Sequence, residues 1–205
     1  MKRTLLFTVL TAALLFSIRS EAQIPGVGKI KKILPEPILG VKLGANFQQI
    51  SGSGWENTYK PGILGGLFVG LQKGKVGVQV EGLIKSVQFA LSTPVNGKIP
   101  DPVKGVYLDV PVMFEYKIIP RIWAQIGPQY SMLLSAKESG NDVKNSFNPG
   151  DFSGVLGLQA LLPVHLTVGV RYILGFTDIN KESFPGASGA WKNRTVQLSV
   201  GFRFL

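Results

Sequence analysis

The chain has 205 residues, a formal charge of +10, 45% hydrophobic residues, 25 glycines and no cysteine. The lack of cysteine excludes disulfides, thiolate metal sites, cysteine nucleophiles and a lipid-modified N-terminal cysteine. The basic residues are scattered along the chain, and an anionic lipid surface or charged loops explain the positive charge at least as well as nucleic acid does. No nucleic-acid partner is therefore predicted.

The first 22 residues have the pattern of an export signal. Lys2 and Arg3 precede an apolar stretch over residues 5–18, and Ser20 and Ala22 place small residues where a signal peptidase reads the chain. The apolar stretch is shorter than the roughly 20 residues that a spanning helix needs. The sequence therefore predicts a signal peptide over residues 1–22, cleaved after Ala22. No later segment is long and apolar enough to cross a membrane as a helix, so a membrane-spanning mature chain would cross as strands.

Residues 23–37 do not share the pattern of the rest of the chain. Apolar residues recur there at helical spacing, with lysines between them, and Pro35 and Pro37 close the segment. The segment is predicted to be a periplasmic leader. Either a short amphipathic helix at the membrane surface or an unstructured stretch would fit its composition.

From residue 38 onward, apolar and polar residues alternate with a period of two, which is typical of strands with one apolar face. In the segment 104–117, for example, Val106, Leu108 and Val110 share one face, whereas Tyr107 and Asp109 share the other. The predicted strands cover residues 38–48, 61–72, 75–87, 104–117, 121–134, 151–162, 165–177 and 193–205. The strand at 61–72 has the weakest pattern, because its glycines blur the two faces.

The connections between these strands alternate in length. Short connections lie at 72–75, 118–121 and 162–165, and long polar ones lie at 49–60, 88–103, 135–150 and 178–192. Outer-membrane barrels have short periplasmic turns and longer extracellular loops. The predicted fold is therefore an all-β, eight-stranded antiparallel up-and-down transmembrane β-barrel over residues 38–205, with short periplasmic turns and four longer extracellular loops.

Aromatic residues near the strand ends of the apolar face fit the aromatic girdles of such barrels. They are Phe47, Tyr116, Phe152, Phe176, Phe202 and Phe204. A soluble lipocalin-like barrel would instead turn its apolar face inward, and the alternation alone does not show which face is inside.

The charged residues of the polar face are the candidate functional set. By strand parity, the inward-pointing charges are Lys42, Glu81, Lys85, Asp109, Glu115, Arg171 and Arg203. An eight-stranded barrel is just wide enough to be filled by its own side chains, and unpaired buried charges would be costly. The sequence therefore predicts a structural salt-bridge network that fills the lumen, with a proton or ion path through the carboxylates as the alternative.

No enzymatic or metal site is predicted. The single histidine, His165, lies in a short turn, which makes a Ser-His-acid site improbable. Asp109 and Glu115 are six residues apart on one strand, about 20 Å, and cannot share a metal. The glycine-rich segment 62–70 lacks the lysine and the following helix of a phosphate-binding loop. No cofactor is predicted.

Five sequence blocks, taken in order, resemble the PorT-like outer-membrane β-barrel proteins of the Bacteroidetes. The blocks are GVKLGANF (residues 40–47), YLDVPVMFEYK (107–117), GPQYSMLLSAK (127–137), VGVRYILGFTDI (168–179) and NRTVQLSVGFRF (193–204). The resemblance implies an eight-stranded outer-membrane barrel, in a family whose namesake is linked to a protein secretion and gliding system. It supplies no catalytic residues, and Leu205 follows the usual terminal aromatic.

The predicted protein is a small non-enzymatic barrel in the outer membrane, acting as a membrane-anchored surface or secretion-associated interaction module. Its expected partners are outer-membrane lipid, the barrel assembly machinery and a surface or secretion-system protein. Two alternatives remain open at the level of sequence. One is transport or the handling of a lipid or hydrophobic ligand through the barrel, and the other is a soluble periplasmic lipocalin-like binder.

Overall fold

A computed structural model describes residues 34–53, 59–89, 102–138, 141–144, 148–177 and 188–205. Its strands are β1 (Glu36–Ser53), β2 (Lys60–Lys73), β3 (Val76–Phe89), β4 (Val103–Ile119), β5 (Ile122–Glu138), β6 (Asn141–Asp142), β7 (Gly150–Leu161), β8 (Leu166–Gly175) and β9 (Ser188–Arg203). Among these residues, no helix is long and apolar enough to cross a membrane.

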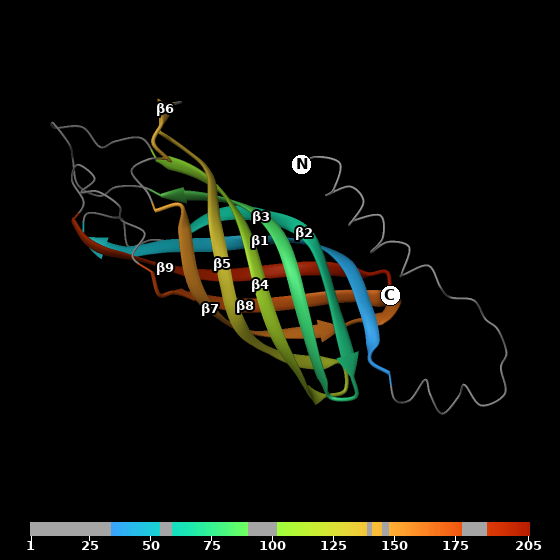
Figure 1. Ribbon diagram of the computed structural model, residues 1–205. Coiled ribbons are helices and arrows are strands. Elements are labelled where there is room, and N and C mark those ends of the chain that lie inside the picture. The colour runs from blue at the N-terminus through green and yellow to red at the C-terminus, as the bar shows by residue number, and fades with distance from the viewer. Residues whose placement is uncertain (1–33, 54–58, 90–101, 139–140, 145–147, 178–187) are drawn as a thin grey trace, which may run out of the picture. The chain divides into compact units, whose positions relative to one another are not determined.

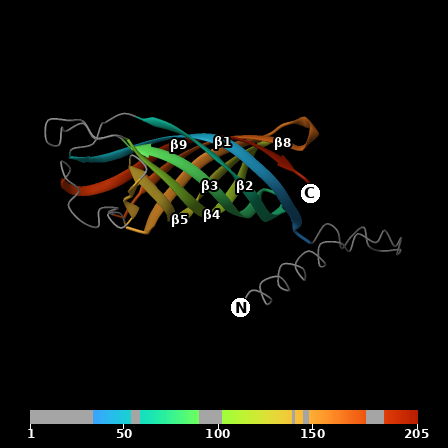
Figure 2. The same cartoon turned by 90° about the horizontal axis from the view of Figure 1, so that it is seen from above.

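The long strands form one closed antiparallel sheet. Each pairs with the next along the chain, β5 pairs with β7, and β9 returns to pair with β1. The two-residue strand β6 pairs only with the end of β5. Figures 1 and 2 show the strands tilted around a common axis, as closure of a barrel requires. The prediction of an eight-stranded up-and-down barrel is confirmed.

Each predicted strand corresponds to an observed one, and the main differences lie at the ends next to the long connections. β1 continues to Ser53 and β5 to Glu138, beyond the predicted ends at residues 48 and 134. The polar side chains there weaken the alternation, whereas hydrogen bonds to the neighbouring strand continue. β1 begins at Glu36, inside the predicted leader. The predicted signal peptide and the rest of the leader, up to residue 33, lie outside the described residues.

The short connections require unusual backbone conformations. Gly74 between β2 and β3 has φ +61°, and Arg121 between β4 and β5 has φ 71°. Between β7 and β8, the 3₁₀ turn Pro163–His165 contains Val164 and His165 at φ 57° and 62°. Positive φ lets each turn reverse the chain within a few residues. Together with the C-terminal end of β9, these turns form the turn end of the barrel (Figure 1).

The polar face of every long strand points inward. On β5, Trp123, Gln125 and Gln129 are buried, whereas Ile126 and Tyr130 are exposed. A soluble lipocalin-like binder would have the opposite arrangement, so that alternative is ruled out. The apolar outer face is instead suited to contact with lipid hydrocarbon.

The predicted aromatic residues lie mostly on the outer face. Tyr116, Phe152, Phe176, Phe202 and Phe204 are exposed, and Phe47 is half-buried. The Phe152 and Phe176 rings are 6.5 Å apart near the loop end, and the Phe202 and Phe204 rings are 5.6 Å apart near the turn end. Aromatic pairs near the two ends of the barrel fit the girdles expected at the two membrane interfaces.

Close backbone approach explains the glycines of β2. A Cβ atom on Gly66 would collide with the carbonyl oxygen of Gly82 on β3, whereas a Cβ on Gly82 would meet nothing within 4 Å. Glycine at position 66 therefore permits the tight curvature of this part of the wall. The blurred alternation that made β2 the weakest prediction is a consequence of that curvature.

Candidate functional site in the barrel lumen

The centre of the lumen is organised around the carboxylate of Glu81 on β3. Lys42 on β1 approaches Glu81 Oε1 with its Nζ at 2.6 Å. Arg171 on β8 donates to the same carboxylate through two nitrogens, Nη2 to Oε1 at 2.6 Å and Nη1 to Oε2 at 2.8 Å. Gln79 adds a further bond from its Nε2 to Oε1 at 2.5 Å. One buried acid therefore holds two buried bases in a charge-assisted, partly bidentate arrangement.

A second carboxylate, Glu115 on β4, is bound by amides instead of bases. Gln125 donates to its Oε1 at 2.6 Å, and Gln72 donates to its Oε2 at 2.8 Å. Gln125 also accepts a bond from Arg171 Nε at 2.9 Å, which joins the Glu115 group to the Glu81 group. Glu115 is completely buried, so these amide contacts replace the water that its charge would otherwise require.

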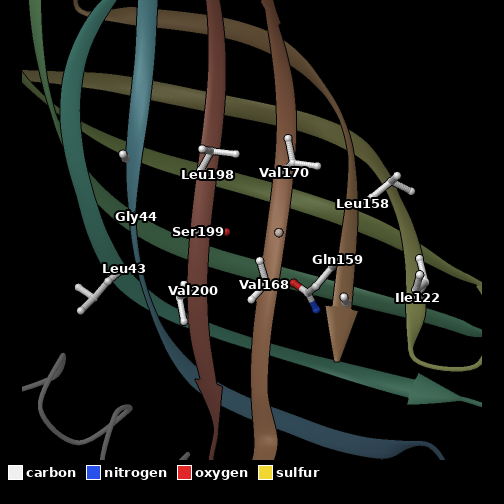
Figure 3. A pocket seen from close by; sticks show the side chains of 13 residues that line it. Leu43, Gly44, Ile122, Leu158, Gln159, Val168, Val170, Leu198, Ser199 and Val200 are labelled. Carbon is white, nitrogen blue, oxygen red and sulfur yellow. The ribbon is translucent and has the colours of Figure 1, made fainter. Parts of the chain in front are cut away.

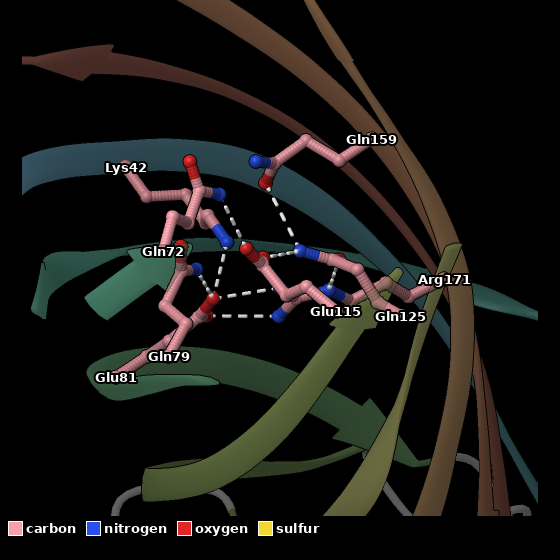
Figure 4. A network of polar contacts seen from close by, with 8 residues as sticks. All are labelled: Lys42, Gln72, Gln79, Glu81, Glu115, Gln125, Gln159 and Arg171. Atoms are coloured by element: carbon pink, nitrogen blue, oxygen red, sulfur yellow. Dashed lines mark hydrogen bonds and ion pairs between the residues drawn. The ribbon is translucent and has the colours of Figure 1, made fainter. Parts of the chain in front are cut away.

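Two further contacts extend the network to the remaining walls. Gln125 donates to Gln159 on β7 at 3.2 Å, and Arg203 on β9 donates to Gln72 on β2 at 3.1 Å. Figure 4 shows how most of these side chains converge in the lumen. The lumen network is defined as Lys42, Gln72, Gln79, Glu81, Glu115, Gln125, Gln159, Arg171 and Arg203. Each of the eight long strands contributes at least one member.

A separate group of buried polar residues lies toward the loop end. Lys85 and Asp109 form an ion pair at 2.9 Å, and Lys85 Nζ lies 5.4 Å from the centre of the Tyr107 ring. Asn193 donates to Asp151 at 2.9 Å and accepts a bond from Gln48 at 2.8 Å.

The seven charged residues singled out from the sequence therefore fall into two groups, and all seven are buried. Lys42, Glu81, Glu115, Arg171 and Arg203 belong to the lumen network, whereas Lys85 and Asp109 pair at a different level. Strand parity places these side chains inside, but it does not say which strands face one another across the barrel.

Sequence reasoning missed the amides that connect the charges. Gln72, Gln79 and Gln125 donate to the carboxylates of Glu81 or Glu115, and Gln159 accepts a bond from Gln125. All four lie on the polar face of their strands, so the alternation in the sequence already places them inside the barrel. They were not assigned a role because glutamine carries no charge.

Apolar side chains fill the lumen around the polar network. Phe68 and Leu83 are almost completely buried, and Met113, Val155 and Ile173 form a small cluster. Lys42 Nζ lies 5.5 Å from the centre of the Phe68 ring. In the part of the chain that the structure describes, no group of three or more His, Asp or Glu side chains could hold a metal ion.

An apolar groove of about 650 Å³ lies on the outer face of the wall formed by β7, β8, β9 and β1. Its sides are exposed apolar side chains such as Leu43, Val170 and Leu198, and Ala45 and Ala160 contribute small side chains to its lining. Figure 3 shows the labelled apolar residues of this wall. The groove therefore opens toward the lipid side of the barrel.

Among solved structures, Neisserial surface protein A shows the same fold. Neisserial surface protein A has a TM-score of 0.56 and 10% identity, with 81% of this chain and 97% of that chain covered. OprG from Pseudomonas aeruginosa has a TM-score of 0.49 and 13% identity, with 83% and 96% covered. Ail of Yersinia pestis, solved with the heparin analogue sucrose octasulfate, has a TM-score of 0.48 and 14% identity, with 82% and 99% covered.

Comparison of the sequence itself gives a family. No curated protein matches the chain. The model of the outer membrane protein beta-barrel domain matches residues 38–181, which is most of the chain and nearly all of the barrel up to β9. The apolar outer face, the polar lumen and the closed eight-stranded sheet agree with that match. The chain belongs to the outer membrane protein beta-barrel domain family, and its barrel lies in the outer membrane in contact with lipid.

Proposed function

We propose that this protein is a non-enzymatic outer-membrane anchor whose barrel is filled by its own side chains and whose long loops bind a surface or secretion-system partner. The observation that carries the proposal is the lumen network. It links all eight long strands, and the Arg171–Glu81 contact joins opposite walls. Because these contacts cross the lumen from wall to wall, the binding function is assigned to the ends of the barrel.

The connections at the loop end supply the candidate binding segments. Residues 54–59, 90–102, 139–149 and 176–187 separate the long strands there, whereas the connections at the turn end are much shorter. Long loops on a rigid scaffold are common positions for binding residues. The five PorT-like sequence blocks support placing the chain with the PorT-like proteins of the Bacteroidetes and favour a secretion-associated partner. Export through a cleaved signal peptide and insertion by the barrel assembly machinery complete the proposal.

Conductance across a planar lipid bilayer tests the filled lumen. Purified mature protein is reconstituted, and its heat-modifiable gel mobility verifies that the barrel is folded. We expect no stable ion conductance from the wild-type barrel. A variant with Arg171→Ala and Glu81→Ala removes the contact across the lumen and should raise the frequency of open events. Steady conductance from folded wild-type protein would contradict the proposal and favour transport through the barrel.

Cross-linking in intact outer membranes tests the position of partner binding. One variant replaces residues 90–102 with a short Gly-Ser linker, and a matched variant exchanges Gly74 and Lys75 at the turn end for Asn and Gly. Both should retain the mobility shift of a folded barrel. We expect only the first variant to lose cross-links to another protein. Cross-links that depend instead on the turn end would place the partner on the periplasmic side.

The outer groove favours a second candidate, the handling of a lipid or another hydrophobic ligand. This role would use the outer wall, because the groove is lined by apolar groups that face lipid. Ala160→Phe should occupy the groove, and Val80→Phe places the same ring on the outer face of β3, on the opposite side of the barrel from the groove. If one lipid species is bound selectively there, mass spectrometry of co-purified lipid should show its loss only in Ala160→Phe. An unchanged lipid profile in both variants would contradict this second role.

A further inference from the structure

Three polar side chains gather on the outer face of the wall that carries the apolar groove, toward its loop end. Tyr172 belongs to β8, Arg194 belongs to β9, and Tyr59 directly precedes β2. All three are exposed. The side chain of Tyr59 hydrogen-bonds to that of Tyr172, and Arg194 is near enough for its positive charge to act on the Tyr59 hydroxyl. Two hydroxyls and a guanidinium are therefore close together on the outside of the barrel.

The charge of Arg194 is not neutralised by an acid of the surrounding wall. In the sheet, Arg194 lies opposite Leu174 on one side and Gln49 on the other. Among the described residues it forms no ion pair, and Asp151, the acid at this end of β7, is buried in the lumen. Lys192 is exposed two residues closer to the loop and adds a second positive charge. The outer surface at this position therefore favours an anion.

Arg194 lies where the apolar band of β9 ends. The outward side chains that follow it toward the turn end are Val196, Leu198, Val200 and Phe202. Leu198 lines the groove and is four residues from Arg194, about 13 Å along the strand. The hydrocarbon of one leaflet is about 15 Å thick, half of the bilayer core. A lipid with its headgroup at Arg194 therefore has its acyl chains at the depth of the groove.

We propose that this wall binds one phosphate-bearing lipid of the leaflet at the loop end, and the proposal rests on the lipid-handling role given above as the second candidate function. Arg194 binds the phosphate through charge-assisted hydrogen bonds. Of Tyr59 and Tyr172, one donates to the other, which leaves one hydroxyl hydrogen for a further phosphate oxygen.

The groove holds one acyl chain of the same lipid (Figure 3). Its volume of about 650 Å³ lies within the range of ligand-binding pockets, and its lining is mostly apolar. Small side chains at Ala45 and Ala160 leave this space open between larger neighbours such as Leu43 and Leu158. The headgroup contacts and the groove together distinguish one bound lipid from the lipids that surround every barrel.

Retention of two matched lipids tests the headgroup contact. The mature protein is folded in an uncharged maltoside detergent, and its heat-modifiable mobility verifies the fold. Native mass spectrometry then counts the lipid molecules retained from phosphatidic acid and from diacylglycerol with the same acyl chains, which differ only in the phosphate group. We expect one phosphatidic acid per barrel, bound about tenfold or more tightly than diacylglycerol, because the guanidinium adds a charge-assisted contact.

Four variants separate the headgroup from the groove. Arg194→Gln should reduce the preference for phosphatidic acid by about tenfold, and Tyr172→Phe, which removes a neutral hydroxyl, by about threefold. Lys104→Gln is the matched control, because it removes an exposed base from the loop end of β4, across the barrel from β9, and should leave the preference unchanged. Ala160→Phe should reduce the retention of both lipids, because the ring occupies the groove.

The proposal is supported if Ala160→Phe loses both lipids and Arg194→Gln loses the preference for phosphate. If Ala160→Phe loses both lipids but Arg194→Gln keeps the preference, lipid handling by the groove stands and the phosphate contact is overturned. Failure of the wild-type protein to retain either lipid, or full retention by Ala160→Phe, overturns both. Equal effects of Lys104→Gln and Arg194→Gln also overturn the phosphate contact, because the preference would then reflect only the overall charge of this end.

Discussion

Arg171 and Glu81 meet across the full width of the barrel. Their strands, β8 and β3, are four positions apart in the closed ring of eight, and the two side chains are joined by bonds of 2.6 and 2.8 Å. A bidentate ion pair of this kind restrains the separation of opposite walls as well as neutralising two charges. The lumen network therefore connects opposite walls of the barrel, whereas the hydrogen bonds between neighbouring strands run around the wall.

Glu81→Gln should strongly destabilise the barrel. It leaves the buried charges of Lys42 and Arg171 without their shared carboxylate, and breaking a buried ion pair in this way costs about 3–5 kcal/mol. Urea unfolding in lipid vesicles, followed by tryptophan fluorescence, measures the free energy of unfolding. Glu36→Gln removes an exposed acid from β1 and is the matched control, with an expected change within about 0.5 kcal/mol. Equal effects of the two substitutions would contradict the central role of Glu81.

Replacing all three charges together should cost less than replacing the acid alone. Lys42→Met, Glu81→Leu and Arg171→Met remove both bases along with the acid, so no uncompensated charge remains among the three. Apolar replacement of a buried charge triad is often neutral or stabilising. The triple variant should therefore be more stable than Glu81→Gln in the same urea experiment. If the triple variant is less stable than Glu81→Gln, the loss of the charge-assisted bonds costs more free energy than the removal of the unpaired bases restores.

Leu198→Arg should destabilise the membrane-inserted barrel by about 2–4 kcal/mol, because it introduces a charge on the lipid face near the middle of β9. Leu198 is 47% exposed on that face. Val164→Arg is the control, since Val164 is 73% exposed in a turn and the cost near the interface falls to about 0–1 kcal/mol. Unfolding in bilayers of matched thickness measures both. Similar costs at the two positions would argue that Leu198 does not face the hydrocarbon.

Gly66→Ala should destabilise the barrel, because its added methyl group collides with the carbonyl oxygen of Gly82. Overpacking of this kind costs about 1–3 kcal/mol. Gly82→Ala adds the same methyl group where no atom lies within 4 Å, and its expected effect is within about 0.5 kcal/mol. The difference in free energy of unfolding between the two variants is the informative quantity. Equal stabilities would show that β2 can move away from β3 at little cost.

The sequence by itself determined the all-β class, the strand positions, the alternation of short and long connections and the parity of the charged side chains. These properties depend on residues that are a few positions apart, and the two-residue period of a strand allows them to be predicted from the sequence. Arg171 and Glu81 could thus be assigned to the same face without knowledge of their distance. The glycines of the strand at 61–72 could likewise be seen to blur its two faces, but the close approach of Gly66 to Gly82 could not be predicted.

Only the tertiary structure decided which face was inside and which charges met. A barrel with an apolar lumen would show the same alternation along its strands. Only the closed structure, in which the polar face points inward, excludes such a barrel. Arg171 and Glu81 are 90 residues apart, and their pairing depends on strand order, stagger and tilt around the ring. The bond from Arg203 to Gln72 could not be predicted either, because the two residues are 131 positions apart and lie on strands that do not pair with each other. Such contacts depend on geometry across the barrel, which the pattern along a single strand does not contain.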